Sequence, residues 1–519
     1  MKRIMLTGAT GHMGVPTFEQ ILETGKFDIT LFMRCSKKNI KFVKKYKKTA
    51  IKKGINLRIV FGDIYDYDAC KMAVQDADYI IHMAAIIPPK SDYDSIETFK
   101  TNYEGTKCLV DAVVEMGLAD TVKFVHIATV AEYGNRDYKH PWGRIGDPLV
   151  CSYYDVYGIS KIRGEKYVLE SGIKNWVSLR QTGVLYDEMM MANSSDGLMF
   201  HTCFNVPIEW TTARSSGLLL KNLVTQDSEG VLEEAFWRKC YNIGNGAASR
   251  VTGYDTVNAG FQLMGATAKE LFNPNDCATR NFHCMWYLDS HILEDYFHFQ
   301  NESFYDYWKD MSKKFWYFKF GKPYKKLIKK MMIEKLYKSP NAPKYWVNNN
   351  LEGRINAFYG GIDKYNAIPN DWKDFGLLCE GKLPDGTPID YEDLKDITKT
   401  KEKGLWLNHG YDESKPDSEL DIADMQQAAE YRGGKCLSEN MVKGDLYTKL
   451  KWQDYYGNEF MATPYTVLKA GHWSDAETPA PWRFDEIAKH SPFVAQIWYD
   501  THDVNENNVC TFDDAQDIE

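Results

Sequence analysis

The stretch Thr7-Gly8-Ala9-Thr10-Gly11-His12-Met13-Gly14 decides the fold of this 519-residue chain. An apolar run over 2–7 precedes it and predicts a short strand, and apolar residues at helical spacing follow it as far as Gly25. Glycines between a strand and a helix let the backbone approach a pyrophosphate, which the helix N-terminus attracts with free N–H groups and its dipole. The Gly-x-x-Gly-x-x-Gly spacing therefore predicts a dinucleotide-binding loop.

The end of the next expected strand, over 29–33, indicates which dinucleotide fits. NAD-type sites place an acidic residue there to bind the ribose hydroxyls. This chain has Arg34 instead, followed by Ser36, Lys37 and Lys38. Cations and a hydroxyl suit a 2′-phosphate, so we expect NADP(H), with NAD(H) as the alternative. A solvated basic loop is the other reading of these residues.

Further apolar strands alternate with helical stretches along the first half of the chain. They are expected over 57–61, 79–83, 123–127 and 176–179. This alternation predicts an α/β fold, a Rossmann-type doubly wound parallel sheet. Ligands bind at the carboxyl ends of such strands, where Asp63, Ala84 and Thr129 lie.

A pair of residues suited to proton transfer follows the fifth strand. Tyr157 and Lys161 are four positions apart on an expected helix, so their side chains share one face. A nearby ammonium and a positive nicotinamide ring would favour the phenolate, so that Tyr157 could exchange a proton near neutral pH. Lys161 could also hold the nicotinamide ribose, and Thr129 could hydrogen-bond the substrate oxygen. A surface helix pair is the alternative reading.

Several motifs of the first 300 residues resemble the extended short-chain dehydrogenase/reductase superfamily, in its NAD(P)-dependent epimerase/dehydratase and hydroxysteroid-dehydrogenase branch. The resemblance rests on Thr7 to Gly14, Gly62-Asp63, His82-Met83-Ala84-Ala85, Asn102-Tyr103-Glu104-Gly105-Thr106, Ala128-Thr129 with Tyr133-Gly134, Tyr157 to Lys161, and Tyr241-Asn242-Ile243-Gly244.

The resemblance implies a role for each matching residue. Tyr157 becomes the acid/base, Lys161 lowers the tyrosine's pKa and binds ribose, Thr129 orients the carbonyl, and Asp63 lies near adenine. With the loop reading above, the expected cofactor-binding residues are Gly8, Thr10, Gly11, His12, Met13, Gly14, Arg34, Lys37, Asp63, Ile64, Met83, Ala84, Ala85, Asn102 and Lys161.

The substrate is less well defined than the chemistry. Residues 211–216 lie where many sugar-nucleotide members carry an aspartate motif, but here they read Thr-Thr-Ala-Arg-Ser-Ser. We therefore expect first an NADP(H)-dependent oxidoreductase that interconverts an alcohol and a ketone on a bulky apolar substrate, sterol-like or polycyclic. A nucleotide-sugar epimerase or dehydratase with tightly bound NAD(P) is the alternative. A non-catalytic dinucleotide-sensing protein is a further one.

Composition bounds the domain organisation and the partners. We expect a Rossmann core over about 1–180, a substrate lobe over about 181–300, a basic aromatic helical segment over 301–345 and an extension over 346–519. A net charge of −9 argues against general nucleic-acid binding. Scattered cysteines, a strand that begins at residue 2 and the lack of a long apolar run favour a cytoplasmic protein. Homodimerisation is left open.

The basic aromatic segment allows two readings. Its lysines alternate with aromatic and aliphatic residues, which would suit peripheral contact with an anionic membrane surface through 309–338. The reading that we favour from sequence is an amphipathic helical hairpin packed on the core, with its lysines in water. An aromatic helix over 281–308 is expected to precede it and to close the substrate lobe.

Residues 400–490 resemble a small treble-clef-like zinc module, through Gly433-Gly434-Lys435-Cys436-Leu437-Ser438, Lys451-Trp452, Gly457-Asn458-Glu459-Phe460 and Gly471-His472-Trp473. In that module cysteines and a histidine bind the metal. Here the matching positions are Asp454, Asn458, Ser474 and Glu477, which lack the soft ligands that structural zinc requires. We therefore expect a metal-free module with an aromatic core, and no metal site.

Overall fold

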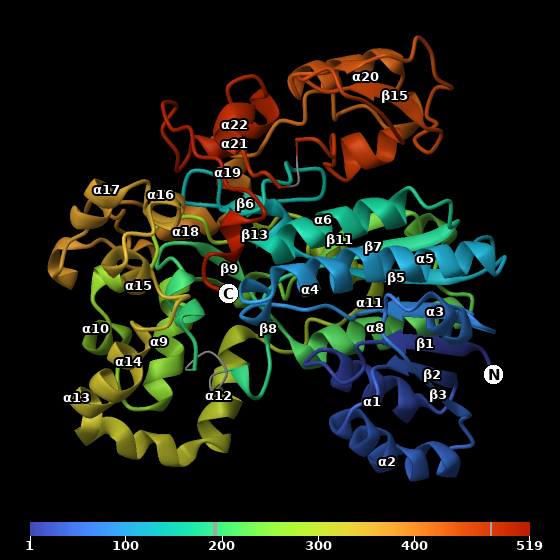
Figure 1. Cartoon of the computed structure of the whole chain (residues 1–519), viewed down its shortest axis with the longest axis horizontal. Helices are drawn as coiled ribbons and strands as arrows, with labels where there is room; N and C mark the ends of the chain where they lie inside the picture. The colour runs from blue at the N-terminus through green and yellow to red at the C-terminus, as the bar shows by residue number, and fades with distance from the viewer. Residues whose placement is uncertain (190–194, 478–479) are drawn as a thin grey trace.

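A computed structural model describes residues 1–189, 195–477 and 480–519. A layered α/β unit built from the first half of the chain fills the right of the view, and the C-terminal third extends over the left and the top (Figure 1). None of the described helices combines the length and the apolar character that crossing a bilayer requires.

The central sheet has seven strands, all parallel, in the order β11-β7-β5-β4-β1-β2-β3. Buried apolar side chains dominate the inner strands, because helices cover both faces. The predicted doubly wound parallel sheet is confirmed. The strands are β1 (Arg3–Thr7), β2 (Asp28–Met33), β3 (Leu57–Phe61), β4 (Tyr79–His82), β5 (Lys123–Thr129), β7 (Asn175–Gln181) and β11 (Lys239–Ile243).

Two groups of helices cover the sheet. On one face α3 (Tyr67–Val74) and α6 (Val156–Leu169) flank α5 (Gly105–Glu115), and on the other α1 (Gly14–Thr24) packs against α8 (Ala213–Ser228). Side chains of successive strand residues point to opposite faces, so that Ile4 and Leu6 join the α1–α8 core while Met5 joins the α3–α5 core. The helix expected after the glycine loop ends at Gly25, whose φ of 67° is a left-handed cap.

Three short strand pairs lie in or next to the region expected to form the substrate lobe. β8 (Val184–Leu185) pairs with β10 (Thr211–Thr212), β9 (Pro207–Glu209) with β12 (Arg250–Thr252), and β6 (Trp142–Gly143) with β13 (Trp286–Tyr287).

The prediction of a single aromatic helix over 281–308 is wrong. The segment forms β13, then α11 (His291–Phe297), then the first turn of α12 (Phe304–Lys314). His298 ends α11 with a left-handed backbone, φ 46°. The Ser303 hydroxyl, with Asp306 three residues on, starts α12 through a capping box. These two capping signals divide what hydrophobic periodicity alone reads as one helix.

The C-terminal module over 420–477 packs against the first half of the chain. It contains α20 (Ile422–Tyr431) and an antiparallel sheet of β14 (Lys435–Cys436), β15 (Leu450–Gln453) and β16 (Glu459–Ala462). Buried apolar residues of the module share one core with residues of α6, β7 and β11. The boundaries expected between domains stay predictions.

Candidate dinucleotide and proton-transfer site

A cavity of about 560 Å³ lies at the carboxyl ends of β1 to β4, where a doubly wound sheet places its ligand. The glycine loop forms one wall, and the turns after β2, β3 and β4 form the others. Of the residues expected to bind a cofactor, those that line it are Gly8, Thr10, Gly11, Arg34, Asp63, Ile64, Met83, Ala84 and Ala85.

The glycines of the loop bring three backbone segments together. Gly8 has φ 69°, and a Cβ atom there would lie 2.7 Å from the Ala84 backbone nitrogen. A Cβ atom on Gly14 would lie 2.1 Å from the Gly8 carbonyl oxygen. Neither position therefore accepts a side chain, and α1 begins at Gly14, directly after the loop. This cradle fits a dinucleotide pyrophosphate.

The groups expected at the 2′-phosphate lie around the turn after β2. Arg34 is exposed and lines the cavity, and so does Lys38, whereas Lys37 does not. Ser36 caps α2 (Lys37–Lys52), and Asn39 joins Thr10 to the Arg34 carbonyl with hydrogen bonds of 3.1 and 2.8 Å. Asn39 thus fixes the turn relative to the glycine loop. The sequence reading missed Asn39, and the capping Ser36 three residues earlier is the signal that could have placed it.

The remaining expected cofactor residues lie near the cavity without lining it. The His12 ring stacks on Tyr186 with 3.7 Å between ring centroids, on the far side of the loop. Met13 precedes α1 and packs on its core. Asn102 is buried, donates to the Ile86 carbonyl and accepts from the Ile86 N–H, so it fixes the turn that follows β4.

Thr129 and Tyr157 come together at the end of β5 and the start of α6. The Thr129 side chain caps the turn that follows β5 by accepting a hydrogen bond from Ala131 N. Burial raises the pKa of the Tyr157 phenol, and its hydrogen bond with Thr129 opposes that rise. In this structure burial thus favours the neutral phenol, and the lowered pKa expected beside a nicotinamide ring stays a prediction.

Lys161 lies one turn further along α6 and points inward. Its Nζ donates to the Ile127 carbonyl at 2.7 Å and lies 3.5 Å from His126 Nε2. Burial lowers the pKa of Lys161 to about 8, while the neighbouring Glu132 and Glu165 raise it. The ammonium is thus held beneath the sheet's carboxyl end, in contact with the last residues of β5.

A second, aromatic cavity of about 310 Å³ adjoins the proton-transfer residues, because Ser152 to Asp155 form part of its wall. The sequence did not single it out, since its lining comes from segments far apart in the chain. Asp155 and His283 form an ion pair at 3.4 Å on this wall. Apolar residues make up much of the rest, among them Trp210, Phe261, Met264, Phe282, Trp308 and Phe358.

The four residues expected at the ligand positions of a zinc-like module do gather in one place. Asp454 accepts hydrogen bonds from the Asn458 amide and from the Ser474 hydroxyl, the latter at 2.6 Å. Glu477 accepts from Tyr455 N at 3.2 Å, and burial raises its pKa to about 7. These hydrogen bonds link the loop that contains residues 454–458 to the segment that contains residues 474–477. Their kinship with a zinc module stays a prediction.

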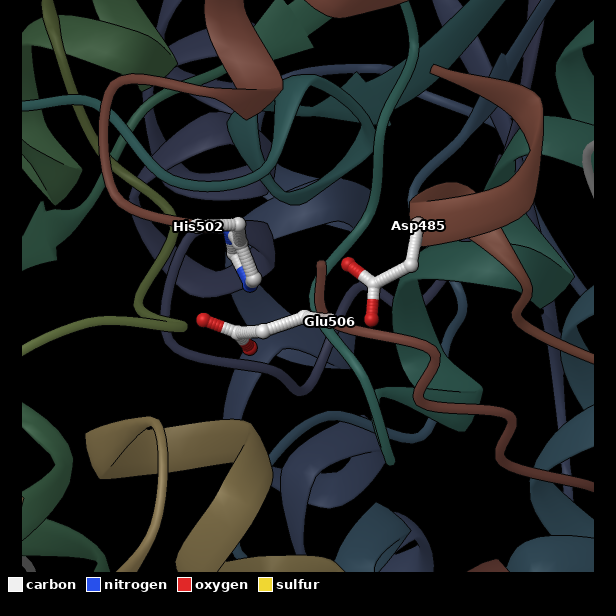
Figure 2. A group of neighbouring side chains, drawn as sticks. All are labelled: Asp485, His502 and Glu506. Carbon is white, nitrogen blue, oxygen red and sulfur yellow. The ribbon is translucent and has the colours of Figure 1, made fainter. Parts of the chain in front are cut away.

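Among the described residues one group could offer three metal ligands: Asp485, His502 and Glu506 (Figure 2). The Arg280 guanidinium already forms two hydrogen bonds with Glu506, at 3.0 and 2.6 Å. Asp485 accepts hydrogen bonds from Trp498 Nε1 and from the backbone and side chain of Asn508. We interpret the group as an ion-pair cluster, in which arginine supplies the positive charge.

Sequence comparison places the resemblance in the first third of the chain. Residues 5–170 match the family model described as GDP-mannose 4,6 dehydratase. The chain is 30% identical over 167 residues to a UDP-N-acetylglucosamine 4,6-dehydratase (inverting) of Campylobacter jejuni, a match that spans 32% of this chain and 42% of that protein. It is also 30% identical over 98 residues to a vaccinia virus 3 beta-hydroxysteroid dehydrogenase/Delta 5-->4-isomerase, spanning 19% and 25%.

Among solved structures, a dTDP-glucose 4,6-dehydratase of Bacillus anthracis in complex with NAD is similar at 18% identity, with a TM-score of 0.44 over 61% of this chain and 99% of that one. The sequence matches to the Campylobacter and vaccinia virus proteins span less than half of the length of either protein. The family-model match over residues 5–170 lies in the region whose motifs resemble the extended short-chain dehydrogenase/reductase superfamily.

Proposed function

We propose that this protein is an NAD(P)-dependent enzyme that oxidises an alcohol of a nucleotide-activated sugar to a ketone and returns the hydride to the sugar within the same turnover. The observation that carries the proposal is the glycine cradle at the carboxyl ends of β1 to β4, with Thr129 at the same end of the neighbouring β5 and Tyr157 hydrogen-bonded to it. The 30% identity to an inverting dehydratase lies in the same region and supports it. The nucleotide-sugar enzyme was the alternative hypothesis from the sequence, and it is better supported than the enzyme for a bulky apolar substrate that was expected first.

When bound, a nicotinamide would accept the hydride and then return it. Tyr157 would take up the alcohol proton on oxidation and return it on reduction, and the Thr129 hydroxyl beside it would orient the oxygen that loses and regains that proton. Lys161, bound to the Ile127 carbonyl, keeps a positive charge under the cofactor's expected ribose position. Arg34 and Lys38 favour NADP(H) over NAD(H).

The residues next to Thr129 favour epimerase-type chemistry over dehydration. Elimination of water needs a second acid or base at the sugar, but Val130 and Ala131 are apolar and buried. Glu132 accepts a hydrogen bond from Thr129 N, its other carboxylate oxygen lies 3.3 Å from Arg180 Nε, and its side chain is fully buried. A dehydratase would have to take its second group from the wall of the aromatic cavity, where Asp155 and His283 lie.

A specific observation keeps the first sequence reading as a second candidate. The aromatic cavity offers Trp210, Phe261, Phe282 and Trp308 to a ligand, which suits a polycyclic substrate. The partial match to a viral hydroxysteroid dehydrogenase points the same way.

Homodimerisation remains a prediction.

Cofactor stoichiometry separates these candidates. Purified protein is incubated with UDP-N-acetylglucosamine or GDP-mannose and a trace of NAD(P), and the sugar is followed by NMR. The proposal expects conversion of a sugar with no net change in free NADPH. Net NADPH consumption with a polycyclic ketone, and no sugar conversion, would favour the second candidate. Dinucleotide binding without turnover of either class would favour a sensor.

A further inference from the structure

A basic aromatic surface covers the outer edge of the substrate lobe. We propose that it docks on the surface of an anionic phospholipid bilayer. It runs from α12 through η8 (Trp316–Tyr324), α13 (Lys325–Ile328) and η9 (Lys329–Ile333) to α14 (Glu334–Leu336). The exposed apolar side chains that define it are Trp316, Tyr317, Phe320, Tyr324, Leu327 and Met331.

These side chains face solvent to an extent that a packed hairpin does not explain. Trp316 is 57% exposed, Phe320 62% and Met331 65%. The same segment also has a buried side, where Ile333 and Leu336 pack into the core of the lobe. The segment therefore presents a second apolar face outward, and burying that face in another phase would be favourable.

The charge of the segment indicates what the exposed apolar face would be buried in. Residues 309–338 carry eleven lysines against two acidic residues, Asp310 and Glu334, although the whole chain has a net charge of −9. In the part of the chain that the structure describes, Lys319, Lys322, Lys326 and Lys330 have no carboxylate within ion-pair distance, whereas Lys313, Lys314 and Lys325 each pair with one. Unpaired lysines beside exposed aromatic rings match a bilayer interface, which offers anionic headgroups above and acyl chains below.

A second lysine-rich helix shows that charge alone does not produce this surface. Helix α2 also exposes many lysines, among them Lys44, Lys47 and Lys48. Its aromatic residues point inward, because Tyr46 and Phe42 pack on the α1 side of the sheet. The two segments thus differ in exposed aromatic area, which makes α2 a matched control.

The position of the surface is compatible with docking. In Figure 1, α12, α13 and α14 lie along the lower left rim of the molecule, away from the central sheet and from the module around α20 and β15. Trp308 of α12 and Met332 of η9 also line the aromatic cavity. Docking would hold that cavity next to the bilayer. If the proposed function is correct, its substrate can then carry an apolar chain, a consequence that rests on the proposed function while the docking itself does not.

Vesicle co-sedimentation tests the proposal without any assay of activity. Full-length protein is mixed with phosphatidylcholine vesicles, with or without phosphatidylglycerol. We expect binding to the anionic vesicles only, weakened by raising NaCl from about 0.05 to about 0.5 M. The triple variant Lys322→Glu, Lys326→Glu, Lys330→Glu should bind about 100-fold more weakly or worse, and Trp316→Ala with Phe320→Ala should weaken binding by a similar factor.

The α2 variant Lys44→Glu, Lys47→Glu, Lys48→Glu changes the net charge by the same amount and should keep wild-type binding. Unchanged melting temperatures would show that each variant is folded. Failure of the wild type to bind anionic vesicles overturns the proposal. So does equal binding to neutral vesicles, an equal loss in the α2 variant, or tighter binding to duplex DNA than to vesicles. None of these results depends on finding a substrate.

Discussion

The Nε2 atom of His472 lies 2.8 Å from the Oε2 atom of Glu165, so a residue of the C-terminal module contacts the helix that carries Tyr157 and Lys161. Both side chains are buried. The Arg180 guanidinium binds the same carboxylate at 2.6 Å and donates to the Ala470 carbonyl at 2.7 Å. The module is therefore part of the structure that supports the candidate site from behind.

Replacing His472 should loosen this junction. In His472→Ala the buried Glu165 carboxylate loses one of its hydrogen-bonding partners, so unfolding should become easier by about 1–3 kcal/mol. His472→Gln keeps a side-chain N–H donor and should cost less. Urea unfolding of both variants measures the difference. An alanine variant as stable as the wild type would mean that the module does not support α6.

Glu477 should make the module less stable as pH rises. Its folded pKa is raised to about 7 by burial, while the unfolded pKa is near 4.5. The folded state therefore binds the proton more tightly, and the stability that this gives is present below pH 4.5 and is lost as pH rises to 7. Glu477→Gln should be more stable than the wild type by about 3 kcal/mol at pH 8, and by less than about 1 kcal/mol at pH 5. Melting temperatures that differ equally at both pH values would contradict this.

Arg34 should select the dinucleotide. Arg34→Asp removes a cation expected at the 2′-phosphate and adds a repelling charge, so NADPH should bind about tenfold or more weakly while NADH changes little. Fluorescence titration of both cofactors checks this. Lys37→Ala is the matched control, since Lys37 does not line the cavity and should leave NADPH affinity unchanged. Equal affinity of the wild type for NADPH and NADH would refute the selection.

The protein should hold no stoichiometric zinc. The four candidate ligand positions are Asp454, Asn458, Ser474 and Glu477. Their side chains form hydrogen bonds within this part of the module, and none of them offers a thiolate or an imidazole. Elemental analysis of protein purified without chelator should find zinc well below one atom per chain. Stoichiometric zinc, with a melting temperature that chelator lowers, would mean that the four positions or the Asp485–His502–Glu506 cluster form a working metal site.

The sequence predicted the sheet well because its signals are local. Each buried parallel strand is a short apolar run, and the glycine loop and Gly25 mark where α1 begins and ends. Even so, β5 reaches Thr129, two residues further than the apolar run, because Ala128 and Thr129 continue to pair with Arg180 and Gln181 of β7. Pairing of this kind depends on the neighbouring strand, which local composition does not reveal.

The candidate site was less predictable wherever it depends on side-chain direction. Lys37 and Lys38 are adjacent on α2, and only the helix phase that Ser36 fixes turns Lys38 toward the cavity. The lowered pKa expected for Tyr157 depends on a nearby ammonium and a nicotinamide ring, and the sequence did not reveal that the Lys161 Nζ binds the Ile127 carbonyl. The outward aromatic face of 316–331 was also hidden, because amphipathic periodicity does not say which of two apolar faces is covered.

Comparison of Tyr157→Phe with the wild type is the most direct test of the central claim. The change removes the phenolic proton and keeps the ring, so conversion of a nucleotide sugar should fall by about 10²–10⁴-fold. NADPH affinity and melting temperature, measured on the same preparations, should stay near wild-type values. Loss of conversion with intact cofactor binding is the result that we predict, and full conversion by the phenylalanine variant would contradict the account.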